Sequence, residues 1–137
     1  MSTVAAMLEA LELVFTWPTP LWVIVGLLLG TLAGALPGIG SALGTAIVLP
    51  LTLPLAPVNA IVLLVSMYSG AMYGGSISAI LVNVPGTGGA AATTFDGYPM
   101  SKLGRAVEAL VMSATASSTG GFLSVFALIL LSPVLIE

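Results

Sequence analysis

The feature that most constrains this chain is a long stretch without any ionisable side chain. No Asp, Glu, Lys, Arg or His lies between Glu12 and Asp96, which leaves residues 13–95, 83 in all, uncharged. A second uncharged run extends from Ala109 to Ile136. A water-soluble domain needs a charged and polar exterior, which such runs cannot supply. In a bilayer the preference is reversed, because charge is costly there and apolar side chains are stable. The sequence therefore predicts an integral membrane protein of the all-α class.

Composition excludes several functional classes. The 137 residues include only two Lys or Arg and carry a net charge of −3, so the chain has no basic patch for nucleic acid. Cys and His are both absent, which removes disulfides, zinc sites, thiol nucleophiles and imidazole bases. No base–nucleophile pair or metal-binding cluster is present, so we expect neither an enzyme nor a cofactor.

The segment 3–17 is predicted to form a short amphipathic helix. Its apolar residues recur at helical spacing on one face, with Glu9 and Glu12 elsewhere. The apolar set is Val4, Leu8, Leu11 and Phe15. Trp17 lies at the end of this helix, and indole rings favour the membrane–water boundary. Two interpretations remain open, namely a helix lying in the interface and an ordinary cap on the first span.

Three hydrophobic blocks follow, at residues 21–49, 58–84 and 107–131. Each exceeds the ~20 residues that a helix needs to cross the hydrocarbon. The first block is expected to be broken at Pro37-Gly38, because proline removes a donor and glycine releases the backbone from helical constraint. The sequence leaves open whether this block crosses once or doubles back.

Residues 85–106 are expected to form a polar loop between the second and third blocks. This loop holds Lys102 and Arg105, the only basic residues of the chain. Because short cytoplasmic loops are enriched in Lys and Arg, the loop is placed in the cytoplasm.

Glycines recur every four residues in the first two blocks. Gly26, Gly30 and Gly34 form one stripe, and Gly70 and Gly74 repeat its spacing. Such stripes let helix backbones approach closely, so we expect these glycines to pack helices. The third block has a comparable face of small residues, formed by Ala109, Ser113, Ser117 and Gly121.

The pattern Pro-Gly-x-Gly-x-Ala occurs twice, at Pro37–Ala42 and at Pro85–Ala90. Neither copy has the lysine or the strand–helix context of a phosphate loop. One interpretation is that Pro-Gly simply ends a helix. The other is a site, since broken helices in transporters present free N–H groups to anionic substrates. The candidate binding residues are Gly38, Gly40, Ser41, Asn83, Gly86, Thr87 and Gly88.

Two further polar residues have competing interpretations. Asn83 could orient a carboxylate or coordinate a cation, or it could cap the end of its helix. Asp96 is the only acid near the second Pro-Gly segment and could carry a proton or sodium ion. The dipeptide Asp96-Gly97 is also a turn signal, and the turn is the preferred interpretation.

Several strings in this sequence together resemble the large membrane subunit of tripartite tricarboxylate transporters, the TctA family. They are LPGIGS, YGGSISAIL followed by NVPG, and DGYPM followed by GRA, in that order. The resemblance covers essentially the whole chain. Pro37–Ser41 and Asn83–Thr87 match the two Pro-Gly signatures of the family, and Asp96–Met100 matches its loop motif.

That resemblance implies a multi-pass secondary transporter subunit in a bacterial inner membrane, driven by an ion gradient. Its expected partners are a small membrane subunit and a periplasmic solute-binding protein that delivers a carboxylate such as citrate. Members of the family are far longer, so residues 1–137 are expected to be the N-terminal portion of a permease domain. The alternatives are a non-transporting membrane assembly module and an inactive truncated remnant.

Overall fold

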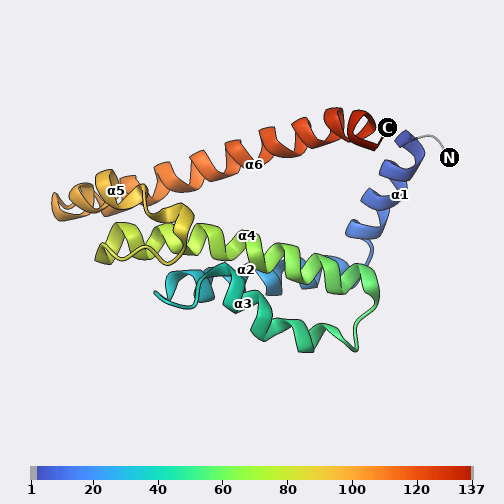
Figure 1. Ribbon diagram of the computed structural model, residues 1–137, viewed down its shortest axis with the longest axis horizontal. Coiled ribbons are helices and arrows are strands. Elements are labelled where there is room, and N and C mark those ends of the chain that lie inside the picture. The colour runs from blue at the N-terminus through green and yellow to red at the C-terminus, as the bar shows by residue number, and fades with distance from the viewer. Residues whose placement is uncertain (1–2, 137) are drawn as a thin grey trace.

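The computed structural model describes the backbone of residues 3–136 and the side chains of residues 8–131, so the side chain of Val4 lies outside the described residues. The described chain is helical and contains no strand. Its elements are α1 (Thr3–Phe15), α2 (Thr19–Ala35), α3 (Gly40–Val48), η1 (Leu49–Thr52), α4 (Pro57–Val82), η2 (Gly88–Ala90), α5 (Thr93–Lys102) and α6 (Ala106–Ile136), shown in Figure 1. The prediction of an all-α membrane protein with a short N-terminal helix is confirmed.

Two described helices are long and apolar enough to cross a bilayer, namely α4 and the part of α6 from Ala106 to Leu131. Counting α1 and α2 as one span, bent by 74° between Phe15 and Thr19, gives a third crossing by length and composition. Figure 1 shows α1 lying across the long direction of the other helices. The side chains of Phe15 and Trp17 are 78% and 74% exposed, so the bundle does not cover this end of α1.

The first hydrophobic block is broken where the sequence predicts. Helix α2 ends at Ala35, and Leu36 is extended, as expected for a residue before proline. Gly38 and Gly40 then have φ values of +96° and +64°, which reverse the chain and which residues with a Cβ rarely adopt. Helix α3 therefore runs back beside α2 and α4, and the block doubles back (Figure 1).

Helices α2 and α4 are parallel neighbours whose backbones lie in close contact. A Cβ at Gly26 would lie 2.6 Å from the Leu63 carbonyl oxygen, and one at Gly30 would collide with the Met67 carbonyl. Gly70 faces Leu27 in the same way. Residues with higher numbers in α2 contact residues with higher numbers in α4, so the two helices run in the same direction. The expected helix-packing role of the glycine stripes is confirmed.

A small apolar core lies at the end of this pair away from the Pro-Gly segments. Its buried residues are Val48 of α3 and Leu63 and Met67 of α4. Trp22 of α2 packs against them from one side. The core joins α3 to the α2–α4 pair, so these three helices form one packed unit.

The segment expected as a polar loop contains helix η2 and helix α5. The turn expected at Asp96-Gly97 is not formed, and both residues belong to α5. Gly97 is buried against α4, where an added Cβ would lie 2.7 Å from the Ile80 Cγ1 atom. Close packing on α4 stabilises a helix that the local sequence does not favour. Asp96 also lies in the first turn of α5, where the helix dipole stabilises a negative charge.

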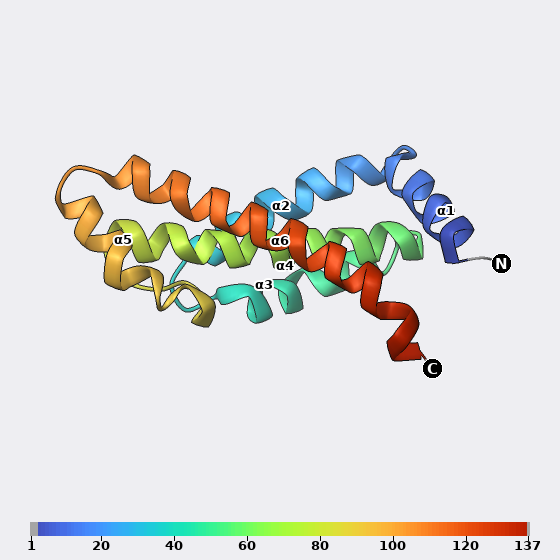
Figure 2. The ribbon, with the colours of Figure 1, turned by 90° about the horizontal axis from the view of Figure 1, so that it is seen from above.

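Helix α6 starts beside α5 and α4 and diverges from them toward its C-terminal end (Figure 1). It crosses over α4 when the molecule is viewed from above (Figure 2). No residue in the most hydrophobic stretch of α6 is buried in the described structure. The divergence leaves a space between α4, α5 and α6.

Candidate functional site

The second Pro-Gly segment folds back along the helix that precedes it. Asn83 ends α4 in the left-handed conformation, with φ of 60°. The chain then reverses, so that the Gly86 N–H donates a hydrogen bond to the Gly75 carbonyl at 3.3 Å. Gly75 precedes the last residue of α4, Val82, by seven positions. At about 1.5 Å per residue, Gly86 therefore lies beside α4 roughly 10 Å before the end of that helix.

At this depth the two Pro-Gly segments meet. The carbonyl oxygen of Gly86 lies 3.3 Å from the position that a Cβ of Gly40 would take. A Cβ at Gly86 itself would collide with the Gly34 carbonyl and would lie 2.9 Å from the Ser78 hydroxyl oxygen. The end of α2, the start of α3, the last third of α4 and the 83–87 segment therefore share one junction, which we call the Pro-Gly junction.

The Pro-Gly junction offers polar groups without a fixed charge. Helix α3 begins at Gly40 with Ile39 as its N-cap and has no side-chain cap. Its first N–H groups therefore lack intrahelical acceptors and carry the positive end of the helix dipole. Thr87 is only 8% exposed, and its buried hydroxyl oxygen has no hydrogen-bond partner in the described structure. A buried polar atom without a partner is uncommon and requires an explanation.

The remaining predicted site residues are divided among several positions. Ser41 is half-buried in the first turn of α3, whereas Gly38 and Gly88 are exposed and face open space. Asn83 is exposed at the left-handed end of α4, which is the geometry of a helix cap. The N–H of Gly86 is already bonded to Gly75 and is not available to a ligand.

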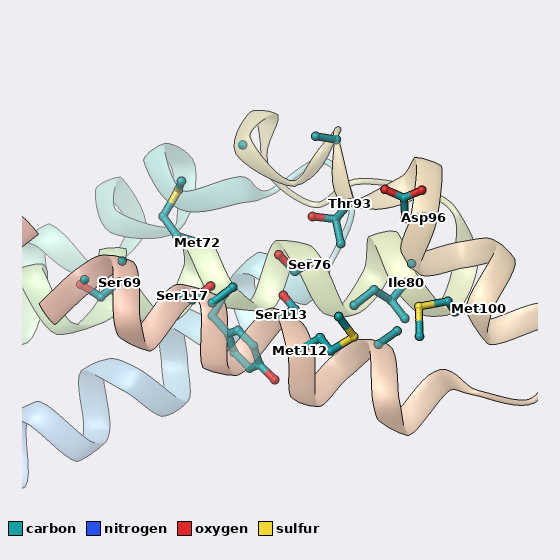
Figure 3. Close-up of a pocket in the computed structure, with 18 of the residues that line it drawn as sticks. Ser69, Met72, Ser76, Ile80, Thr93, Asp96, Met100, Met112, Ser113 and Ser117 are labelled. Atoms are coloured by element: carbon teal, nitrogen blue, oxygen red, sulfur yellow. The ribbon is translucent and has the colours of Figure 1, made fainter. Parts of the chain in front are cut away.

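Asp96 is exposed and lines a groove between α4, α5 and α6, which Gly89 of the second Pro-Gly pattern also lines. This groove encloses about 910 Å³. Figure 3 shows Thr93 and Asp96 on α5, Ser76 on α4, and Ser113 and Ser117 on α6 along it. The hydroxyl-bearing residues that line it are Tyr68, Ser69, Tyr73, Ser76, Thr93, Ser113, Ser117 and Ser124.

The small-residue face of the third block also lines this groove. All four of its members, Ala109, Ser113, Ser117 and Gly121, border the space. Sequence reasoning identified the face but not the groove. The only sequence signal for this groove is the concentration of small and hydroxyl residues late in α4.

Helices of membrane-spanning length, together with a first hydrophobic block broken into α2 and α3, define a class, the helical membrane proteins. Residues 21–137 match the family model described as the Tripartite tricarboxylate transporter TctA family, and the chain belongs to that family. It is therefore a membrane transporter subunit by family, as the sequence resemblance predicts.

One curated relative comes from Agrobacterium vitis and is described as "Uncharacterized 52.8 kDa protein in TAR-I ttuC' 3'region". The two sequences are 41% identical over 78 residues, which are 57% of this chain and 16% of that protein. The chain thus spans only a small part of this relative. No solved structure matches the chain significantly.

Proposed function

We propose that this chain is part of the permease of a secondary transporter that takes up tricarboxylates or related carboxylates. Membership of the TctA family supports this assignment. We further propose that it works in a bacterial inner membrane with a small membrane subunit and a periplasmic solute-binding protein. The role is transport rather than enzymatic, and an ion gradient drives it.

The Pro-Gly junction is the proposed carboxylate site. The observation that carries this proposal is the meeting of Gly40 and Gly86 at the uncapped start of α3. Thr87, the next residue of the chain, has a partnerless hydroxyl that lies against Gly75 of α4. N–H groups and the dipole at a helix N-terminus favour an anion. The Thr87 hydroxyl would donate a further hydrogen bond, and small glycines would let the ligand approach the backbone.

Neutral donors suit a transport site, because the substrate has to be released on the other side. A lysine or arginine in the junction would hold a tricarboxylate through a strong charge-assisted pair. The only two basic residues, Lys102 and Arg105, belong to the end of α5 and the link to α6. Alternating access would follow from motion of α5 and α6 against the packed unit of α2, α3 and α4.

The test is Thr87→Val in the complete transporter, with uptake of radiolabelled citrate into membrane vesicles as the readout. Valine keeps the shape and removes the hydroxyl. A hydrogen bond to a charged group contributes about 1.5–3 kcal/mol, so the KM for citrate should rise at least about tenfold. Thr45→Val is the matched control, because the Thr45 hydroxyl already donates to the Ser41 carbonyl within α3.

Immunoblotting has to show equal assembly of both variants with the partner subunits. A parental KM in the Thr87→Val transporter would reject the carboxylate site. Normal assembly without any carboxylate uptake by the parent would instead favour the non-transporting assembly module. Failure of the parent both to assemble and to transport would favour the inactive remnant.

A further inference from the structure

We propose that the groove between α4, α5 and α6 is a docking surface for one further transmembrane helix, which the rest of the permease supplies. The side of α6 that lines this groove, from Ala109 to Ser124, is its main wall, and we call it the groove side of α6. The proposal rests on the proposed function in one respect only, namely that this chain is part of a permease.

Helix α6 has two different sides. The residues that line the groove recur at i, i+3, i+4 and i+7 from Ala109 to Ser124, and all of them except Met112 are Ala, Ser or Gly. This stripe covers fifteen positions, or about 22 Å at 1.5 Å per residue. The opposite side carries large apolar residues such as Phe122 and Phe126, both of them exposed. In a bilayer, small residues are typical of helix contacts, whereas large apolar side chains are equally stable against lipid tails.

The contact between α2 and α4 shows what such a stripe does when its partner is present. Gly26 and Gly30 lie so close to α4 that an added Cβ would meet the backbone carbonyls of that helix. On α6, by contrast, nothing lies within 4 Å of a Cβ added to Gly120 or Gly121. The groove side of α6 therefore has the composition of a helix contact, but no described helix covers it.

A buried hydroxyl in the wall formed by α4 indicates the chemistry of the docking helix. Ser76 is only 8% exposed and lines the groove, as Figure 3 shows. The nearby Ser78 hydroxyl donates to the Gly75 carbonyl, whereas the Ser76 hydroxyl forms no hydrogen bond within the described residues. Lipid tails offer a hydroxyl no partner, so burial of Ser76 against them would be costly. A helix with an uncharged polar side chain would satisfy Ser76, as polar residues do between membrane helices.

No helix of the described chain is left to fill the groove. Helices α4, α5 and α6 form its walls, α2 packs against α4, and α1 is bent away from α2 by 74°. The alignment with the Agrobacterium vitis relative covers 16% of that protein, so a permease of that length has ample further chain for a docking helix. Water in the groove would satisfy the hydroxyls, but it would not require Gly120 and Gly121, whereas close approach of a second backbone does.

Spin labels on single cysteines test the docking surface in the complete permease in lipid nanodiscs. Ser117→Cys and Ser124→Cys place the label on the groove side of α6, and Phe122→Cys places it on the opposite side. Collisions with oxygen report exposure to lipid, and collisions with a water-soluble nickel chelate report exposure to water. We expect oxygen accessibility at both groove positions to be several-fold lower than at Phe122→Cys, and nickel accessibility to be low as well.

Leu103→Cys is the reference for water, because Leu103 lies in the exposed link between α5 and α6. Oxygen accessibility at Ser117→Cys and Ser124→Cys equal to that at Phe122→Cys would show that lipid fills the groove. Nickel accessibility equal to that at Leu103→Cys would show an aqueous path. Either result overturns the proposal. Size-exclusion chromatography verifies that each labelled variant is folded.

Photocrosslinking identifies the occupant of the groove. The crosslinking amino acid p-benzoylphenylalanine takes the place of Met112, the one large groove-lining residue of α6, so that it adds little bulk. Mass spectrometry should find a crosslink to a permease peptide outside residues 1–137. The same amino acid in place of Phe122 is the control and should react with lipid. A crosslink from position 112 to the small membrane subunit, or to lipid alone, overturns the proposal.

Uptake measurements keep this proposal separate from the proposed function. Protected groove positions in a permease that takes up no carboxylate would support the docking surface and reject the transport function. Conversely, carboxylate uptake that depends on Thr87, together with exposure of Ser117→Cys to lipid or water, would reject only the docking surface.

Discussion

At the residue scale, the contacts around Gly86 determine how the Pro-Gly junction is built. Gly86→Ala adds a Cβ that collides with the Gly34 carbonyl and lies 2.9 Å from the Ser78 hydroxyl oxygen. Overpacking of this kind costs about 1–3 kcal/mol, so we expect a clearly lower melting temperature in detergent. Fluorescence-detected size-exclusion chromatography after heating measures it.

Gly120→Ala is the control for that substitution, because nothing lies within 4 Å of the added Cβ. Alanine is also the better helix former by about 1 kcal/mol, so this variant should melt at the parental temperature or above. Equal melting temperatures for Gly86→Ala and Gly120→Ala would show that the 83–87 segment does not pack against α2.

Individual residues also show where sequence reasoning succeeded. The break at Pro37-Gly38 could be predicted, because the covalent geometry of proline and glycine acts locally. The burial of Thr87 could not, because it depends on the chain folding back from Asn83 to reach Gly75. The helix at Asp96 could not be predicted either, since the local sequence favours a turn there. This helix depends on packing of Gly97 against Ile80, two residues that the local sequence does not connect.

At the scale of the element, α1 is the helix whose role the sequence left open. The 74° bend before α2 turns α1 away from the direction of that helix, and its residues Leu8, Leu11 and Phe15 are exposed. A helix turned out of the bundle with exposed apolar side chains is suited to the membrane interface. Trp17 at its end would then lie at the depth of the lipid headgroups.

Quenching by brominated lipids tests this position of α1. The chain has two tryptophans, so Trp22→Phe leaves Trp17 as the only indole. We expect lipids brominated near the headgroup to quench Trp17 more strongly than lipids brominated near the chain ends. Trp17→Phe, which leaves the half-buried Trp22, controls for general access of lipid. Equal or weaker quenching by the shallow label would contradict an interfacial α1.

At the scale of the whole molecule, the parallel direction of α2 and α4 determines which loops share a side of the membrane. Two parallel helices need a returning segment between them, and α3 with η1 supplies it. The hydrophobic blocks predicted the number of apolar segments, but they did not predict this return. The direction of α3 depends on the positive φ angles of Gly38 and Gly40 and on packing of Val48 against α4.

The direction of α3 has a consequence that cysteine labelling can measure in intact cells. If the first block doubles back, Thr16 before α2 and Leu53 before α4 lie on the same side, whereas Leu103 lies on the other. A single crossing would place Thr16 and Leu53 on opposite sides. The chain contains no cysteine, so Thr16→Cys, Leu53→Cys and Leu103→Cys each report one position without background. All three native residues are exposed.

A membrane-impermeant maleimide should label Thr16→Cys and Leu53→Cys in whole cells, because Lys102 and Arg105 favour a cytoplasmic location for the link between α5 and α6. Leu103→Cys should react only after the membrane is permeabilised. Reversed labelling of all three would preserve the fold and reject only the orientation. Labelling of Thr16→Cys and Leu53→Cys from opposite sides would show that α2 and α4 are not parallel. The meeting of Gly40 and Gly86 would then be impossible as described, since it requires both helices to end at the same side.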